Sequence, residues 1–449
     1  MTKTFTLLFC LPLAVSALAQ TEPKKPQTVD VQLPPPLTLP SDIPAAKLSA
    51  DEAVAVALEK SPVLIAAKAN VLAATGKQQQ VQAGLVPNVT LSSGFNHVET
   101  VGGSGGSGNT GTGSNPSGYN SSLTVRQLVF DFEKTINAAR QAKLLEKVAS
   151  GVLSQTQLDV AYAVKQAYFG LSESQQVVSV AEANVQSVGL QLELAKALMN
   201  SGLGAPPDVV RATTSYDNAL QNLILARTSE LGARVALANV IGIDPRTPIA
   251  ADDKVEPDLA HDSLEALIQS ALQDRPDMLA ANFGVMAADA GLSASKSASA
   301  PSLSVSLGVT ARGDTNPFDT RTGLAGINVA WPVGDGGLTR GLVNQAKAGQ
   351  QSAQATLQQI KLNIVSDVSN AFVQIQAAEQ RVRVSDAEKA NAQESVRIAE
   401  GRYKAGIGTF LEVTDAQSAL VQAETNDVLA KSALNRGRAA LRRAVGKRP

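Results

Sequence analysis

The stretch 402–417, RYKAGIGTFLEVTDAQ, ends a long run rich in alanine and glutamine with a Gly-x-Gly turn, followed by apolar and acidic residues. The stretch 198–213, LMNSGLGAPPDVVRAT, has the same order. Glycine adopts the left-handed conformation that reverses a chain after a helix. The sequence therefore predicts the tips of two helical hairpins. They consist of Gly202, Leu203 and Gly204 in the first hairpin, and of Gly406, Ile407, Gly408 and Phe410 in the second.

The two tips belong to an internal duplication. Pro62 recurs 214 residues later as Pro276, whereas Gly202 recurs 204 residues later as Gly406. The difference falls where the first half carries a longer loop rich in glycine and serine. A repeat with its variation confined to a loop indicates two copies of one structural unit. We expect these units to span residues 48–250 and 251–449.

Each unit combines helical and strand patterns. Ser49 followed by Glu52 is a capping box, which predicts a helix over 48–85 that Pro87 then ends. The segment PSLSVSLGVTAR at 301–312 places apolar residues on one face and small polar residues on the other. This pattern and its length of ~10 residues are typical of a strand in a membrane barrel, and a strand of a water-soluble β-sandwich is the alternative. Second strands are expected near 121–130 and 324–333.

Aromatic residues lie at the ends of these expected strands. Phe130, Phe132 and Trp331 occupy such positions. Membrane barrels carry girdles of aromatic residues at both interfaces. The three residues are therefore candidates for an interfacial girdle.

Two very long helices are expected after the strands. No proline occurs over 132–204, nor over 336–408. At 1.5 Å per residue, each run would be ~100 Å long as a helix. Shorter helices return over about 207–241 and 411–446. Because the two short helices that flank a strand pair together match one long helix, each unit is expected to be a long rod beside two stacked half-rods.

The N-terminus has the pattern of a secretory signal peptide. Residues 1–19 contain Lys3, an apolar run and an Ala-x-Ala cleavage site at 17–19. Cys10, the single cysteine, lies within that peptide, and its lipidation is an alternative interpretation. Residues 20–47 are rich in proline and predict an extended linker. No later segment has 18 consecutive apolar residues, so the exported chain is expected to be secreted, periplasmic or inserted as a barrel.

Two units supply four membrane strands, whereas the smallest closed barrels have about eight. Open sheet edges are not tolerated in hydrocarbon. The barrel is therefore expected to be shared among several copies of the chain, and rotational symmetry would arrange the long helices of those copies into a tube.

Enzymatic chemistry finds little support in the sequence. His97 and His261 are the only histidines, and neither belongs to a metal-ligand or acid–base pattern. The glycine-rich segment at 103–108 lacks the strand–turn–helix setting of a dinucleotide site. The basic tail 436–449 is interpreted as a solvated helix end. A net charge of −1 implies no polyanionic partner, and we expect neither catalysis nor a cofactor.

The signal peptide, the tandem units and the repeated tips resemble the TolC-like outer-membrane efflux proteins. Members typically show a tyrosine, then glycine, then an apolar-acid-apolar-x-Asp-Ala stretch, which here corresponds to Tyr403, Gly406 and 411–416. The resemblance implies a mainly α fold with a membrane β-barrel: a homotrimer with a long periplasmic α-helical barrel and a shared twelve-stranded barrel in the Gram-negative outer membrane.

The resemblance also implies a passive exit duct that docks to a periplasmic adaptor protein and an inner-membrane transporter. We expect the residues of the two hairpin tips, Phe410 included, to form the exposed surface that the adaptor meets. Such a duct serves a tripartite efflux or type I secretion system and contacts outer-membrane lipid, not nucleic acid. An exported trimeric coiled-coil stalk or adhesin is the alternative. A stalk predicts continuous heptads of large apolar residues and no internal duplication, whereas this chain has the duplication.

Two acids after the second tip are candidates for a pore constriction. Glu412 and Asp415 are three residues apart and therefore share a helix face. The resemblance implies that acids at these positions line the periplasmic constriction, where a ring of carboxylates would attract cations. Ordinary helix-start acids, favoured by the helix dipole, are the alternative.

The resemblance further implies polar contacts that hold the entrance shut. Tyr403 matches a tyrosine of that network, and Asp208 matches its acidic partner. The family's type member has an arginine where this chain has Gly408. The latch is therefore expected to be built differently here, with Arg211 as the candidate cation.

Overall fold

The computed structural model describes residues 46–97, 118–202, 204–251, 263–313 and 318–447. The expected signal peptide with Cys10, the glycine-rich segment, Leu203 and His261 lie outside these residues. Strands β1 (Ala46–Leu48) and β4 (Ile249–Ala251) pair in parallel, so Ala46 and Lys47 belong to a sheet and not to the expected linker. None of the helices in the described ranges is long and apolar enough to cross a membrane.

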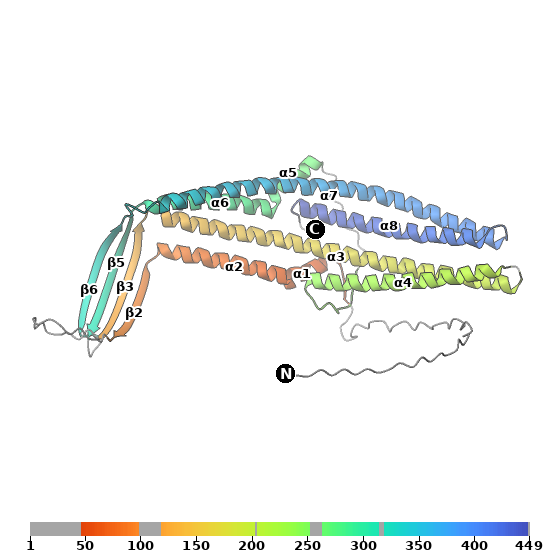
Figure 1. The fold of residues 1–449 in the computed structure, drawn as a ribbon, viewed down its shortest axis with the longest axis horizontal. Helices are drawn as coiled ribbons and strands as arrows, with labels where there is room; N and C mark the ends of the chain where they lie inside the picture. The colour runs from red at the N-terminus through yellow and green to blue at the C-terminus, as the bar shows by residue number, and fades with distance from the viewer. Residues whose placement is uncertain (1–45, 98–117, 203, 252–262, 314–317, 448–449) are drawn as a thin grey trace, which may run out of the picture. The chain divides into compact units, whose positions relative to one another are not determined.

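The described chain repeats one order of elements (Figure 1). The first half contains α1 (Ala50–Lys60), α2 (Pro62–Gln82), β2 (Asn88–Asn96), β3 (Gly118–Phe130), α3 (Lys134–Asn200) and α4 (Pro206–Ile241). The second half contains α5 (Leu264–Asp274), α6 (Pro276–Lys296), β5 (Ser302–Gly313), β6 (Thr320–Ala330), α7 (Leu338–Lys404) and α8 (Phe410–Ala444). Short 3-10 turns end α2 and α6, namely η1 (Ala83–Leu85) and η2 (Ser297–Ser299). The tandem repeat inferred from the sequence is thus confirmed in the fold.

The helix expected over 48–85 begins as predicted but is interrupted. The Ser49 amide donates to the Glu52 carboxylate at 2.8 Å, and the Glu52 amide donates to the Ser49 hydroxyl at 3.3 Å, which completes the capping box. At Ser61 the backbone is extended, and Pro62 starts α2. Proline restricts the residue before it to extended conformations and is well suited to the first helical position. The prediction of one continuous helix was therefore wrong at this point.

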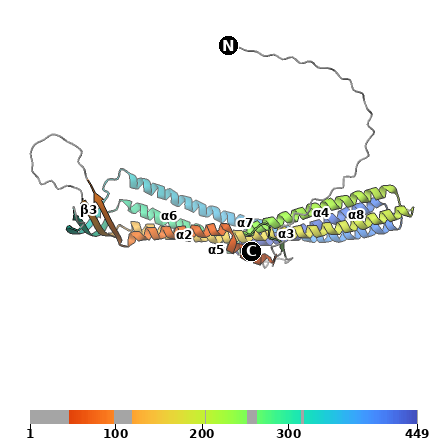
Figure 2. The ribbon, with the colours of Figure 1, turned by 90° about the horizontal axis from the view of Figure 1, so that it is seen from below.

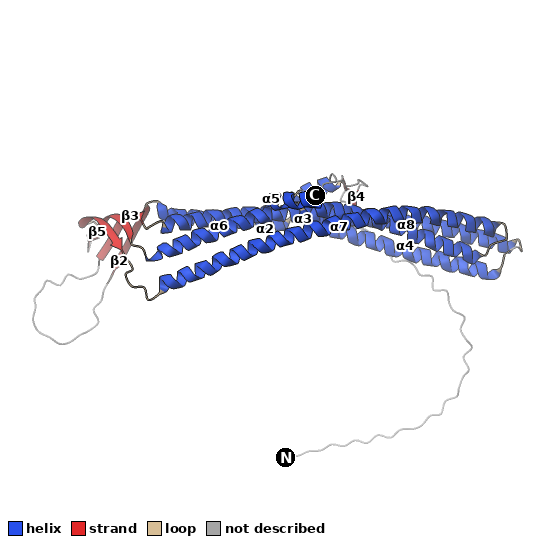
Figure 3. Ribbon diagram, turned by 90° about the horizontal axis from the view of Figure 1, so that it is seen from above, coloured by secondary structure: helices blue, strands red, loops and turns tan. Residues whose placement is uncertain are grey.

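The two long helices carry the other helices along their length. Helices α3 and α7 have 67 residues each, which corresponds to ~100 Å. Helices α2 and α4 pack along α3, and α6 and α8 pack along α7 (Figures 1 and 2). The expected arrangement of a long rod beside two half-rods is therefore confirmed. Contacts of α3 with α6 and α8 join the two halves (Figure 3).

Small residues recur every seven positions along α7. Those that are buried are Ala371, Ala378, Ser385, Ala392 and Ala399. A seven-residue repeat keeps one narrow stripe facing a partner helix and produces a left-handed supercoil. In α2, Ala66 and Ala73 are also seven residues apart, but both are exposed. Buried alanines have the same spacing on the shorter helix α4, at Ala212, Ala219 and Ala226, so long and short helices both pack closely through small residues.

The largest apolar clusters lie where the half-rods meet. In the first half, Tyr168 and Leu171 of α3 pack with Ile241 at the end of α4. In the second half, Ile364 and Val368 of α7 pack in a cluster at the end of α8. These clusters fix the junctions and leave the sheet at one end of the helices and the hairpin tips at the other (Figure 1).

Strands β2, β3, β5 and β6 form an antiparallel sheet in that order. The register places Leu91 opposite Leu123, and Leu123 opposite Val309, on one face. Ile327, opposite Val305 on the same face, is 74% exposed. The other face is polar: the Ser92 and Ser122 hydroxyls lie 2.7 Å apart, and Asn328 donates to Ser306 at 3.1 Å. The alternating strand predicted over 301–312 is confirmed as β5, and the second strands as β3 and β6.

Both edges of this sheet are free in the described chain. Strand β2 pairs only with β3, and β6 pairs only with β5. Each edge therefore presents a row of backbone groups that a neighbouring strand can bind.

Arg275, between α5 and α6, fastens three elements together. Its guanidinium is buried and forms ion pairs with Asp277 at 2.6 Å and with Asp367 of α7 at 3.0 Å. It also donates to the carbonyl of Ala444, the last residue of α8, at 3.3 Å. Burial alone would lower the pKa of Arg275, but the hydrogen bonds and charges of the two aspartates outweigh burial and raise that pKa.

We expect Arg275→Met to destabilise the chain by about 2 kcal/mol. This is less than the ~3–5 kcal/mol typical of a broken buried ion pair, because the side chain of Asp367 is 42% exposed and can be rehydrated. Thermal unfolding followed by circular dichroism would measure the loss. The matched control is Arg246→Met, which removes the exposed Arg246–Asp244 pair and should leave the unfolding temperature unchanged. Equal shifts for both variants would contradict the role of Arg275.

Candidate functional site

The two hairpin tips close by the same backbone geometry. Gly202, after α3, has φ +76°, and Gly406, after α7, has φ +73°. The Gly406 amide donates to the Tyr403 carbonyl, and the Ile407 amide donates to the Arg402 carbonyl, both at 3.0 Å. These bonds satisfy carbonyls that the ending helix leaves without partners. The left-handed turn predicted at Gly202 and Gly406 is confirmed.

The second glycine of each tip has a different role. Neither Gly204 nor Gly408 has a positive φ, so the expectation of left-handed geometry was wrong at these positions. A Cβ atom at Gly204 would lie 2.7 Å from the Met199 amide nitrogen, and one at Gly408 would lie 2.8 Å from the Arg402 Cβ. Glycine is needed there because the chain doubles back against the end of its own helix.

The tip surface differs from the expected one at a single described residue. Ile407 is 69% exposed, and Gly202 and Gly406 are exposed as well. Phe410 was expected on this surface, but it is only 1% exposed. As the first residue of α8, it faces inward and packs in a cluster with Leu192 of α3. The aromatic ring of Phe410 therefore joins the two hairpins and is not available at the surface.

Tyr403 and Asp208, the expected latch pair, come together across the hairpins. Tyr403 lies in the last turn of α7, where its ring is 5.5 Å from that of Phe410, and Asp208 lies in the first turn of α4. Burial raises the pKa of Tyr403, and the negative charge of Asp208 raises it further. Arg211 is exposed and has no hydrogen bond or ion pair to any residue in the described part of the chain. The chain thus brings two of the three latch candidates together.

Glu412 stabilises the start of α8. Its amide donates to the Thr409 hydroxyl at 3.3 Å, and its carboxylate accepts from the Thr409 amide at 3.4 Å. Arg402, at the end of α7, donates to the same carboxylate at 3.3 Å. The hydrogen bond from the Thr409 backbone, together with Arg402, lowers the pKa of Glu412. The helix-start role that was the alternative for Glu412 is therefore present in the fold.

Asp415 lies one turn further along α8. It is exposed, and no other described residue forms a hydrogen bond or ion pair with it. Its charge is therefore free to act on solutes or on other copies of the chain. Arg402, which neutralises part of the charge of Glu412, was missed by the sequence analysis; its position next to Tyr403 in the RYK run was the available signal.

The aromatic candidates gather at the helical end of the sheet. Phe130, at the end of β3, is paired with Leu303 near the start of β5. Ala330, at the end of β6, is paired with Ser302 at the start of β5. Phe130 and Trp331, which follows Ala330, therefore lie at the same end of the sheet. The rings of Phe130 and Phe132 are 4.8 Å apart. All three candidates are about half exposed or more.

A second aromatic group at the opposite end of the strands was missed. The rings of Phe95 and Tyr119, paired across β2 and β3, lie 5.0 Å apart. Phe318, just before β6, lies 5.8 Å from the guanidinium of Arg321. Their positions flanking the strand patterns were the signal that could have identified them.

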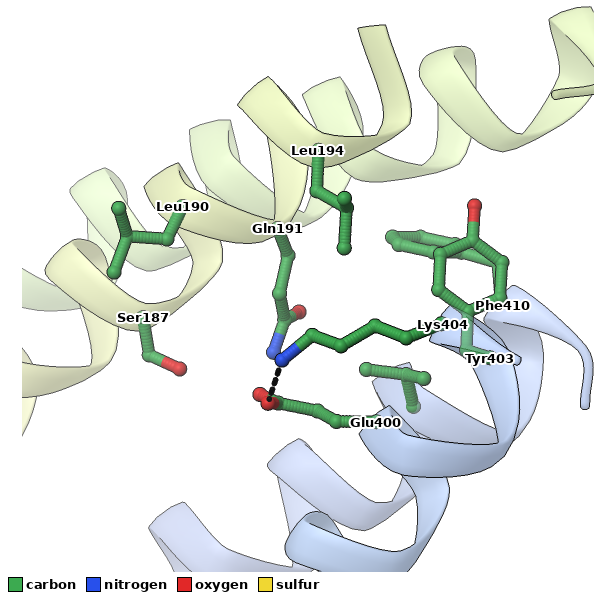
Figure 4. A pocket seen from close by; sticks show the side chains of 9 residues that line it. Ser187, Leu190, Gln191, Leu194, Glu400, Tyr403, Lys404 and Phe410 are labelled. Carbon is green, nitrogen blue, oxygen red and sulfur yellow. Dashed lines mark hydrogen bonds and ion pairs between the residues drawn. The ribbon is translucent and has the colours of Figure 1, made fainter. Parts of the chain in front are cut away.

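A cavity of about 280 Å³ lies beside the tips, between α3 and the α7–α8 hairpin (Figure 4). Its lining combines apolar side chains with the buried amide of Gln191 and an ion pair between Lys404 and Glu400 at 3.1 Å. The sequence analysis did not identify this cavity, because its lining comes from helices about two hundred residues apart. Within the described residues, no group of three or more His, Cys, Asp or Glu side chains could hold a metal ion.

Comparison with known proteins places this geometry in a family. The family described as outer membrane efflux protein matches residues 53–243 and 267–447. Protein CyaE of Bordetella pertussis is 26% identical over 430 residues, which cover 94% of this chain and 89% of that protein. Outer membrane protein TolC of Vibrio cholerae is 26% identical over 378 residues, which cover 82% of this chain and 84% of that protein.

A solved structure has the same fold. The Campylobacter jejuni CmeC outer membrane channel superimposes with a TM-score of 0.79 at 16% identity, covering 88% of this chain and 85% of that one. At this identity the structural likeness shows the fold alone. The two segments that match the family, residues 53–243 and 267–447, together cover more than half of the sequence. The chain belongs to the outer membrane efflux protein family.

Proposed function

We propose that three copies of this chain close into one passive duct, which an adaptor protein and an inner-membrane pump engage from the periplasm. Family membership makes the chain an outer-membrane exit duct for efflux or secretion, with its helices in the periplasm. The observation that carries the sharing of one barrel among several copies is the sheet of four strands, β2-β3-β5-β6, whose two edges are free in the described chain. Three such sheets joined edge to edge give twelve strands.

The apolar face of the sheet supports its contact with lipid. Leu91, Ile327 and Val329 are each 69–75% exposed on this face. The strands have 9 to 13 residues, and a strand needs ~9–11 residues to cross a bilayer. Phe130, Phe132 and Trp331 at one end, with the aromatic group at the other, fit two interfacial girdles.

The tips are proposed as the docking surface and the entrance. Exposed Gly202, Gly406 and Ile407, with Leu203, would meet the adaptor, while Gly204 and Gly408 hold the tight turns. Tyr403 and Asp208 would latch neighbouring helices in the closed state. Glu412 and Asp415, repeated in each copy, would form an acidic ring at the constriction. We propose no catalytic step, because energy for export would come from the pump.

A charge on the lipid-facing side of the sheet should block insertion. Ile327→Arg would place a cation in hydrocarbon, at a cost of about 2–4 kcal/mol at mid-membrane, and should strongly reduce the heat-modifiable trimer in outer membranes. The matched control is Thr322→Arg, on the polar face of the same strand, which should leave trimer yield unchanged. Trimer content is measured by electrophoresis with and without heating and by mass in detergent. A wild-type chain that is a monomer without detergent, or equal trimer yields for both variants, would contradict this assignment.

Strain at the tips should abolish export without affecting assembly. Gly406→Val forces a β-branched residue to φ +73°, and Gly408→Val brings a Cβ to 2.8 Å from Arg402. Both variants should form trimers but lose export. Gly401→Val is the control, because a Cβ at Gly401 meets nothing within 4 Å. Export is measured as resistance to a transported compound; normal export by the first two variants would argue against docking at the tips.

The acidic ring is tested by removing charge while keeping the helix start. The variant combines Glu412→Gln with Asp415→Asn. The Glu412→Gln substitution keeps the capping box, because glutamine can replace glutamate in that motif. Single-channel recordings should show weaker cation selectivity and less block by multivalent cations from the tip side. Because the hydrogen bond from the Thr409 backbone and the nearby Arg402 hold the pKa of Glu412 below its ordinary value, its negative charge should be lost at a lower pH than that of an ordinary glutamate side chain. Unchanged selectivity in the double variant would rule out the ring.

The latch is tested at the hydroxyl and the carboxylate separately. Tyr403→Phe keeps the ring against Phe410 and removes only the hydroxyl, and Asp208→Asn removes only the charge. Each should raise the open probability of single channels several-fold, because contact between the hairpins weakens. Arg211→Met decides whether Arg211 takes part: a similar rise would include it in the latch. If neither Tyr403→Phe nor Asp208→Asn changes the open probability, the latch is not built from this pair.

A further inference from the structure

The cavity beside the tips has an apolar floor and a polar wall (Figure 4). Phe410 and Val413 of α8 are each only 1% exposed and form its floor, and Leu194 of α3 lines its side. In Figure 4 the side chain of Gln191 points from α3 toward Glu400 and Lys404 of α7. Binding sites for small molecules typically combine apolar walls with a few convergent polar groups in this way.

Gln191 is the unusual member of this lining. It is 94% buried, since its exposed fraction is 6%. Neither its Oε1 nor its Nε2 has a hydrogen-bond partner among the described residues. One turn earlier on α3, by contrast, the Ser187 hydroxyl donates to the side-chain carbonyl of Gln417 at 3.1 Å. Leaving a buried amide unpaired costs about 1–3 kcal/mol, and that cost is recovered when a ligand supplies both a donor and an acceptor.

The charges near the cavity favour a neutral ligand. Lys404 and Glu400 lie on its rim and pair with each other at 3.1 Å, so they cancel and offer no net attraction to an ion. A primary carboxamide matches the Gln191 amide with one donor and one acceptor. An aromatic or aliphatic body would fill the space against Phe410, Val413 and Leu194.

We propose that this cavity binds a small, neutral, amphipathic molecule that carries a primary carboxamide, with the carboxamide paired to Gln191. Such a ligand would touch α3 of the first hairpin and α7 and α8 of the second. The lining includes Tyr403 of the proposed latch but neither the exposed tip residues nor the acids of the constriction, and binding at Gln191 does not depend on the function proposed above.

Benzamide is a suitable probe of this site. Its binding to the full chain in lipid nanodiscs, free of competing detergent, is measured by calorimetry and by ligand-observed NMR. Benzamide should bind with saturation. N,N-dimethylbenzamide, which lacks the amide donor, should bind at least about ten-fold more weakly, as expected for one buried amide left unpaired.

Two variants of α3 distinguish binding at Gln191 from non-specific binding. Gln191→Leu keeps the volume and should lose at least about ten-fold in benzamide affinity. It should also keep or raise the unfolding temperature, because no unpaired amide remains buried. Gln186→Leu makes the same change at an exposed position of the same helix and should bind like the wild type. Absence of saturable binding to the wild type, or equal affinity in Gln191→Leu, would overturn the proposal.

Discussion

Close packing of small side chains along the two long helices is the interaction on which the rest of the structure depends. The buried positions at seven-residue spacing on α7, from Ala371 to Ala399, let α8 approach closely over several turns. Long isolated helices gain little stability from propensity alone, and most of it comes from packing of one face. Because each 67-residue helix carries two shorter helices end to end, the sheet and the hairpin tips are held at opposite ends of the repeat.

The tips show how one set of residues can serve both fold and function. Phe410 and Tyr403 connect the two hairpins through a small apolar cluster with α3. Glu412 caps α8 and is paired with Arg402, while Asp415 is left without a partner in the described chain. A substitution of Glu412 by alanine would therefore disturb the turn as well as the charge. The structure explains why charge and folding have to be tested with different replacements.

In the sheet, by contrast, a single chain leaves apolar side chains uncovered and edge backbone groups unpaired. Its register places Leu91, Leu123, Val309 and Ile327 on one face, where no described element covers them. Its edges at β2 and β6 leave backbone groups unpaired on one side. Lipid satisfies such an apolar face, and only further strands satisfy such edges. The proposed contact with lipid and the proposed pairing of strands from further copies would meet these two requirements.

The sequence by itself determined the repeated order of elements, because strand alternation, capping boxes and proline positions are local signals. Strand β5, the long helices and the left-handed turns at Gly202 and Gly406 were all visible in this way. Only the tertiary structure decided what each side chain meets. It buried Phe410, required glycine at 204 and 408 through close approach, paired Glu412 with Arg402, and formed the cavity around Gln191. Each of these features depends on how closely two helix ends or two distant segments approach each other. Local sequence patterns do not encode that approach, because periodicity shows which face of a helix is apolar but not which neighbour this face contacts.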